Sequence, residues 1–240
     1  MQYLATLYDR EDSLTSPGTP EWDAEMGAYE AFHTKHAAAI LGGEALHASD
    51  TARTVRASLV TDGPFTETAE VIGGYFVLEA ETLDDAVEQA ADLPAASTPH
   101  GAVEVRPLVM LWEPEEPVET QPGDTRYLAL VYAPEAEGAP PESPEWEEMS
   151  ARHGRFMDDH VGSLTSGLAL HPVATATTVR VRDGQVRVTD GPAVDAPGVL
   201  GGLYVLRASS PDDAVAVARA IPTSPGGAVE LRPAMELGEG

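Results

Sequence analysis

Hydrophobic and polar residues follow two different periods along this chain, and together they predict six elements in its first half. Residues 3–8, 54–61, 71–80 and 102–108 are rich in β-branched and aromatic residues or alternate with polar ones, which favours strands. Residues 19–41 carry apolar side chains at steps of three and four, which favours a helix. A second helix is expected to begin after residue 82 and to end before Pro94.

Capping residues support both helix starts. Thr19 precedes Pro20, a pair typical of a helix N-terminus, and Gly42-Gly43 is expected to end that helix. Thr82 and Asp85 have the spacing of a capping box. The ends of the predicted helices therefore rest on specific residues as well as on the apolar period.

The whole pattern occurs twice. Three blocks align without gaps: residues 3–56 with 127–180, residues 61–94 with 189–222, and residues 101–107 with 227–233. Identical residues stand at 42 of these 95 positions, which is too many for chance and shows a tandem duplication. We expect two domains, at residues 1–112 and 126–240, joined by an acidic, proline-rich linker at residues 113–125.

The two copies differ in length at one place. Copy two has four additional residues, and its residues 177–182 and 185–189 flank Asp183-Gly184, which is typical of a two-residue hairpin turn. In copy one we expect a single strand over residues 54–61. Gly73-Gly74, inside a predicted strand, indicates a β-bulge.

Each copy thus has the order βαββαβ, the ferredoxin-like split βαβ arrangement. The predicted fold class is α+β, with two fused ferredoxin-like domains. A sheet of this kind is covered by helices on one face and bare on the other. We expect the bare faces to meet in a pseudo-twofold, dimeric α/β-barrel-like arrangement, with a ligand cleft between the copies.

Composition narrows the class of function. The chain has 240 residues, 14 of them basic and 40 acidic, for a formal net charge of −26, and it has no cysteine. Nucleic-acid binding needs a basic footprint and anionic membranes repel negative charge, so we expect neither partner. The first residues lack a basic region and an apolar stretch of signal-peptide length, and no apolar run reaches the length of a membrane span. We therefore expect a cytoplasmic protein.

The acidic surplus has two explanations that the sequence leaves open. One is adaptation to a salty cytoplasm, because about 1 M salt shortens the screening length to about 3 Å and removes self-repulsion. The other is a GC-rich genome, which favours arginine over lysine and explains why Lys35 is the single lysine, but not the surplus of acids. The salt explanation predicts that the melting temperature rises steeply with KCl, and an unchanged melting temperature would contradict it.

Two motifs give both copies a resemblance to a known family. Asp62-Gly-Pro-Phe65, followed by Glu67 and Gly73-Gly74-Tyr75, and the closing Gly101-Ala-Val-Glu-Val-Arg-Pro107 resemble the DGPF-type branch of the YCII-related family. The resemblance covers nearly the whole chain, twice. It implies small ferredoxin-like domains that pair, here fused, and a His–Asp pair in the cleft. For some members it implies association with alternative sigma factors. Copy two departs from the motif at Ala193, so we expect the copies to have specialised.

The leading catalytic candidates are His36 and Asp62. His36, like its counterpart His160, lies near the C-terminal end of the first predicted helix, where it is a general base beside a carboxylate or a packing and capping residue. Asp62, like its counterpart Asp190, stands in Thr-Asp-Gly-Pro, where the carboxylate partners a histidine or forms a tight turn. The catalytic hypothesis pairs His36 with Asp62.

Further residues are binding candidates. They are His47, Arg56, His160, His171, Arg180 and Asp190. His47 and His171 lie between the helix and the next predicted strand, as cleft ligands or as exposed loop residues. The arginines stand on predicted strands, where they bind an acidic ligand through paired hydrogen bonds or form a solvated ion pair. The same alternatives apply to Glu104 and Arg106 and to their counterparts Glu230 and Arg232.

These observations predict an uncharacterised YCII-like protein with a small-molecule-binding or catalytic cleft between its copies. The alternatives are a regulatory or protein-interaction module linked to transcription control, and a structural duplication whose site has decayed. Neither copy has a glycine motif for phosphate or a spaced metal motif, so we expect no cofactor and no metal. We expect a monomer with an internal pseudo-dimer, or a homodimer.

Overall fold

The structure, a computed structural model, divides the chain into two compact units. It describes residues 1–57, 59–65, 68–119, 121–134, 142–196 and 198–237. The first unit contains Met1–Ala45, Thr68–Leu108 and Ala174–Asp195. The second contains Leu46–Glu67, Val109–Val173 and Ala196–Gly240. Each unit is therefore built mainly from one copy and includes one segment of the other.

The elements of the two copies correspond. Copy one contains β1 (Gln2–Arg10), α1 (Pro20–His36), β2 (Ile40–Ala45), β3 (Arg53–Arg56), β4 (Leu59–Asp62), β5 (Glu70–Glu79), α2 (Leu83–Ala91), α3 (Pro94–Ser97) and β6 (Ala102–Trp112). Copy two contains β7 (Thr125–Ala133), α4 (Pro144–His160), β8 (Leu164–Leu170), β9 (Thr177–Arg182), β10 (Gln185–Asp190), β11 (Val199–Ala208), α5 (Pro211–Ala220) and β12 (Ala228–Pro233). The expected caps are present, with Thr19 and Ser143 accepting hydrogen bonds at the starts of α1 and α4.

The sheet of the first unit has the antiparallel order β2-β5-β1-β6-β9-β10. Its first four strands, with α1 and α2, form the ferredoxin-like arrangement. The second unit repeats it as β8-β11-β7-β12, extended by β3 and β4. The predicted α+β class with two ferredoxin-like domains is confirmed.

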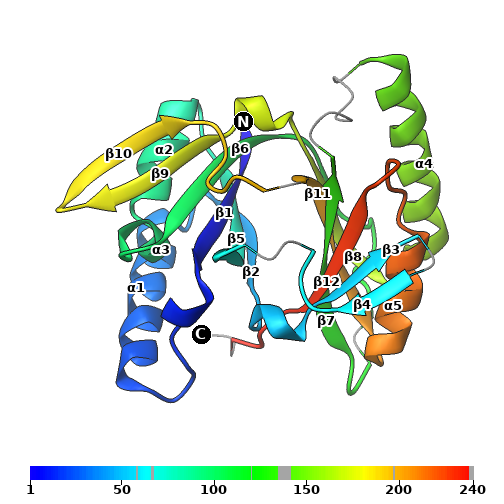
Figure 1. Cartoon of the computed structure of the whole chain (residues 1–240), viewed down its shortest axis with the longest axis horizontal. Coiled ribbons are helices and arrows are strands. Elements are labelled where there is room, and N and C mark those ends of the chain that lie inside the picture. Colours follow the sequence, from blue (N-terminus) through cyan, green and yellow to red (C-terminus); the bar gives the residue numbers. More distant parts are fainter. Residues whose placement is uncertain (58, 66–67, 120, 135–141, 197, 238–240) are drawn as a thin grey trace. The chain divides into compact units, whose positions relative to one another are not determined.

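The outer two strands of each sheet come from the other copy. The hairpin β9–β10 of copy two pairs with β6 of copy one, and the hairpin β3–β4 of copy one pairs with β12 of copy two. In Figure 1 the yellow β9–β10 hairpin lies beside β6, and the cyan β3–β4 hairpin lies beside the red β12. Val179 is part of the first apolar core and Val55 is part of the second, and the half-buried Val181 and Val60 pack against these cores. Burial of these valines stabilises the exchange.

The structure corrects two of the predicted elements. The first helix ends at His36, and residues 40–45, expected as its last turn and stop, form the strand β2. Gly43 suits this strand because a Cβ there would lie 2.6 Å from the Tyr75 carbonyl oxygen. The strand expected over residues 54–61 is a hairpin, turning at Ala57, whose φ is +49°. The second strand of the ferredoxin order is thus β2.

The predicted bulge is confirmed. The register of β1 against β5 shifts between Leu7 and Tyr8, which leaves Gly73 without a partner in the ladder. β11 shows the same shift opposite β7. Among the described helices, none is long and apolar enough to cross a membrane.

Candidate functional site

The Asp-Gly-Pro loop of copy one, residues 62–65, is held by its backbone. The Gly63 N–H donates to the Ala52 carbonyl oxygen at 2.8 Å, and the Gly63 carbonyl accepts from Thr54 Oγ1 at 2.8 Å. Gly63 has a φ of +94°, a conformation that glycine adopts without strain. The Asp62 side chain is exposed at the end of β4. The geometry therefore supports the turn interpretation of this motif.

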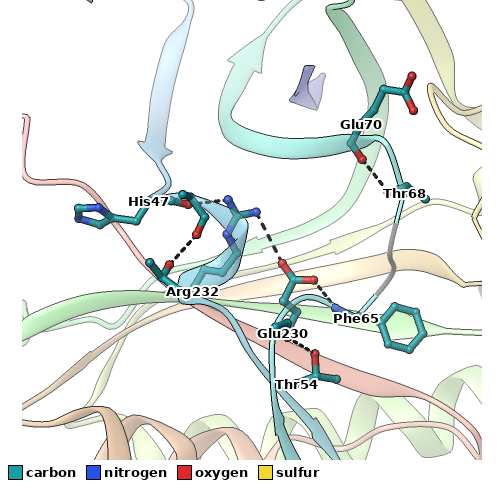
Figure 2. Close-up of polar contacts among 10 residues, drawn as sticks. His47, Thr54, Phe65, Thr68, Glu70, Glu230 and Arg232 are labelled. Carbon is teal, nitrogen blue, oxygen red and sulfur yellow. Dashed lines mark hydrogen bonds and ion pairs between the residues drawn. The ribbon is translucent and has the colours of Figure 1, made fainter. Parts of the chain in front are cut away.

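Phe65 connects the loop to copy two. Its N–H donates to Glu230 Oε2 at 2.9 Å, and its carbonyl oxygen accepts from Arg56 Nη2 at 3.2 Å. Its ring stacks on Tyr132 with centroids 4.7 Å apart, and the Arg56 guanidinium carbon lies 4.9 Å from the ring centroid. Figure 2 shows the bond from the Phe65 N–H to the Glu230 carboxylate. Arg56, a predicted ligand contact, thus binds its own loop.

Glu230 belongs to a buried ion pair. Glu230 Oε1 lies 3.6 Å from Arg232 Nη1, and the two side chains are 4% and 1% exposed. Arg232 Nη2 also donates to the His47 carbonyl oxygen at 2.6 Å, as Figure 2 shows. A solvated cross-strand pair was one sequence interpretation of these residues, and it is wrong. The two residues stand two apart on β12, so they face the same side of the sheet, where they bond to the Phe65 N–H and the His47 carbonyl oxygen.

The first unit repeats this arrangement with the copies reversed. Arg106 Nη2 and Nε donate to Glu104 Oε1 at 2.7 and 3.2 Å, and Glu104 Oε2 accepts from the Ala193 N–H at 3.0 Å. Arg180 Nη2 donates to the Ala193 carbonyl oxygen at 3.1 Å. Asp190 is exposed at the end of β10. The motifs at residues 101–107 and 227–233 therefore each bind the Asp-Gly-Pro loop of the other copy. Glu67, which follows this loop in copy one, lies outside the described residues.

A different cluster surrounds His36. His36 Nε2 lies 2.8 Å from Asp92 Oδ2, and the same oxygen accepts from Lys35 Nζ at 2.7 Å. Asp92 is the residue at which α2 ends, and the His36 ring packs on Phe32 with centroids 4.9 Å apart. Asp62 lies in the second unit, so its pairing with His36 stays a prediction. The carboxylate that the structure brings to His36 is Asp92.

Two opposing effects act on Asp92. Partial burial raises the pKa of its carboxyl, but the hydrogen bonds from Lys35 and His36 outweigh burial and lower the pKa below its usual value. The carboxylate is therefore charged across the physiological range. A charged carboxylate on one ring nitrogen orients an imidazole.

His36 and Asp92 line a pocket of about 680 Å³ in the first unit. The remaining lining residues are Met1, Lys35, Glu79, Ala80, Glu81, Asp85, Glu88 and Gln89. Five of the ten lining side chains are carboxylates. The opposing positive groups are Lys35, which is bound to Asp92, and the terminal ammonium of Met1, which donates to the Ala80 carbonyl oxygen at 2.6 Å. The pocket has a surplus of negative charge.

The other predicted histidines have different surroundings. His160 Nδ1 lies 3.0 Å from the Phe156 carbonyl oxygen, and its ring stacks on Phe156 at 4.7 Å, which is a packing arrangement at the end of α4. The His47 side chain is exposed while its backbone bonds to β12. His171 is half-buried just after β8. None of these three residues is among those that line the His36 pocket.

His153, which the sequence did not single out, has a strongly lowered pKa. His153 Nδ1 lies 2.8 Å from the Tyr204 hydroxyl under α4. Burial, assisted by the charge of Arg152, lowers the pKa of His153 to about 4, and burial raises the pKa of Tyr204. At neutral pH the protonated hydroxyl therefore donates to a neutral imidazole.

Sequence reasoning missed Asp92, the partner of His36. The repeat comparison favours residues that both copies share, and Ala220 stands at the position of Asp92 in copy two. A useful signal was its place in the last turn of the predicted helix, four residues beyond Glu88. Among the described residues, no group of three or more histidine and acidic side chains is arranged to hold a metal ion.

Comparisons with known proteins agree on the repeat. The family model of the YCII-related domain matches residues 1–113 and again residues 125–237. An uncharacterised protein of Rhizobium meliloti is 37% identical over 123 residues, which are 48% of this chain and 98% of that protein. The crystal structure of a protein assigned as a chlorite dismutase aligns over 98% of this chain and 94% of that chain, with 8% identity and a TM-score of 0.42. A score this low carries no argument about function.

Proposed function

The chain belongs to the YCII-related family, and from that premise we propose that its first unit binds a small, positively charged molecule in the His36 pocket. The main observation behind this proposal is the negative charge of the residues that line the pocket. Five carboxylates face one concave site, and its positive groups are already bonded to protein oxygens. Such a site attracts an ammonium or guanidinium group and repels a carboxylate.

The His36–Asp92 pair gives this pocket an oriented hydrogen-bonding group. Asp92 bonds to Nε2 of the ring, so that Nδ1 is left to accept a hydrogen bond from a bound ammonium or guanidinium group. We propose that His36 accepts a hydrogen bond from the bound molecule, and that Asp92 is a positioning residue. The ligand cleft expected between the copies stays a prediction.

The corresponding surface of copy two lacks these groups. Arg207, Ala216 and Ala220 stand at the positions of Glu79, Glu88 and Asp92. Two carboxylates become alanine and a third is replaced by arginine. We therefore propose the site for copy one and not for copy two, which agrees with the expectation that the copies have specialised.

Probe amines test the proposal. We expect 1,4-diaminobutane at low ionic strength to shift amide NMR signals of residues around His36 and α2, while succinate leaves them unchanged. Glu88→Gln is expected to weaken diaminobutane binding about fivefold, because it removes one carboxylate from a site where each contributes on the order of 1 kcal/mol.

An exposed carboxylate on the same unit provides the matched control. Asp23→Asn, at the first turn of α1, makes the same change of charge away from the pocket and is expected to leave the affinity within a factor of two. Equal weakening by both variants would show diffuse attraction to an acidic protein and would overturn the proposal. Signal changes scattered over both units would do the same.

A further inference from the structure

Phe65, in the loop of copy one, contacts Gly198 of copy two, and neither residue is repeated at the equivalent position of the other copy. Gly198, just before β11, faces the Phe65 ring, and a Cβ at Gly198 would lie 2.6 Å from Phe65 Cε1. That distance is a clash, so the ring occupies space that only glycine leaves open. The Phe65 ring of copy one therefore packs against copy two where Gly198 has no side chain.

At the equivalent contact in the first unit, the loop carries the small side chain and the strand carries the large one. Ala193 stands at the position of Phe65, and Glu70 stands at the position of Gly198. The loop of copy two is small where the strand of copy one carries a side chain. Both exchanged loops use the same backbone bonds, from the Phe65 N–H to Glu230 and from the Ala193 N–H to Glu104. The bonds that join the copies are thus equivalent, and the side chains beside them are complementary.

We propose that the two copies are complementary halves of an interlocked pair, in which Phe65 and Gly198 select pairing of copy one with copy two over pairing of either copy with itself. A pair of two first copies would place Phe65 against Glu70. A pair of two second copies would leave the space of the Phe65 ring empty and would lose its stacking on Tyr132. Overpacking and an unfilled cavity both destabilise.

A thermodynamic cycle in the intact chain tests the contact. Gly198→Ala is expected to lower the melting temperature by about 5 °C, because the methyl group displaces the ring. In a Phe65→Ala background the same change is expected to lower it by less than about 1 °C. Effects that add would show that the two residues do not interact, and would overturn the proposal.

The mirror variants provide the matched control. Ala193→Phe is expected to lower the melting temperature, because it sets a ring against Glu70, and Glu70→Gly is expected to recover most of that loss. Glu79→Gly, at the other end of β5, makes the same substitution without facing the loop and is expected to recover nothing. Recovery by both glycine variants would contradict the assigned contact.

Pair selection is measured directly on the full chain with a protease site inserted between residues 113 and 124. After cleavage, unfolding in urea and refolding, native mass spectrometry counts the three possible pairs. We expect mixed pairs to exceed either like pair at least tenfold, and Glu70→Gly to increase pairs of two first copies. A statistical 2:1:1 distribution would overturn the proposal, and if the halves do not refold, the cycle in the intact chain decides.

Discussion

Replacing Glu230 with leucine is expected to lower the free energy of unfolding by about 3–5 kcal/mol, the range for breaking a buried ion pair from one side. The substitution leaves the guanidinium of Arg232, 1% exposed, without its countercharge, and the Phe65 N–H without its acceptor. Urea unfolding followed by tryptophan fluorescence measures the loss. Glu104→Leu, in the equivalent pair of the first unit, is expected to behave alike.

Two variants separate the charge effect from packing. Glu230→Leu with Arg232→Met removes both charges and is expected to recover at least about 1 kcal/mol of the loss, because no unpaired charge stays buried. Glu236→Leu changes an exposed glutamate six residues further along the chain and is expected to stay within about 0.5 kcal/mol of the parent. A loss below about 1 kcal/mol for Glu230→Leu would show that the buried pair contributes little.

Acid is expected to destabilise the second unit through His153. Its folded pKa is about 4 and its unfolded pKa is about 6.5, so between these values the unfolded chain binds a proton that the folded chain does not. The free energy of unfolding therefore falls as the pH falls from about 6.5 to about 4, by up to about 3 kcal/mol. Above about pH 6.5 both states hold a neutral imidazole and the contribution is complete.

His153→Gln keeps a hydrogen-bond acceptor for Tyr204 and removes the titration. Between pH 7.5 and pH 4.5, the parent is expected to lose about 2–3 kcal/mol more unfolding free energy than this variant. His33→Gln, an exposed histidine on α1, is the control and is expected to follow the parent. Identical pH curves for the parent and His153→Gln would contradict the buried, neutral state of His153.

The duplication, the helices and most strands could be predicted because they rest on local signals. Thr19 with Pro20 and Thr82 with Asp85 cap helices wherever they occur, and a period of two marks a strand in either copy. Gly43 misled the prediction, since a glycine pair ends helices and also permits close strand approach. Tertiary pairing to β5 decides between the two.

The hairpin exchange could not be predicted for a specific reason. Thr54-Val55-Arg56 and Thr178-Val179-Arg180 are identical, so these residues do not indicate which closing strand each hairpin pairs with. Other contacts distinguish the partners, such as the bonds of Phe65 to Glu230 and of Arg182 to the Ala96 and Gly101 carbonyl oxygens. Of the His36 site, the histidine could be predicted because it occurs in both copies. Its partner Asp92 could not, because copy two has Ala220 at that position.

The exchanged hairpins also set an order for folding during synthesis. The outer strands of the first sheet are in copy two, so that sheet is incomplete until β10 has left the ribosome. Val55 pairs with Val229, so β3 waits for almost the entire chain before it gains its neighbour. Pairing over such a separation is slow, because a long loop must close first. The β3–β4 hairpin, with Leu59 exposed, is therefore the segment for which a nascent chain most needs protection from wrong partners.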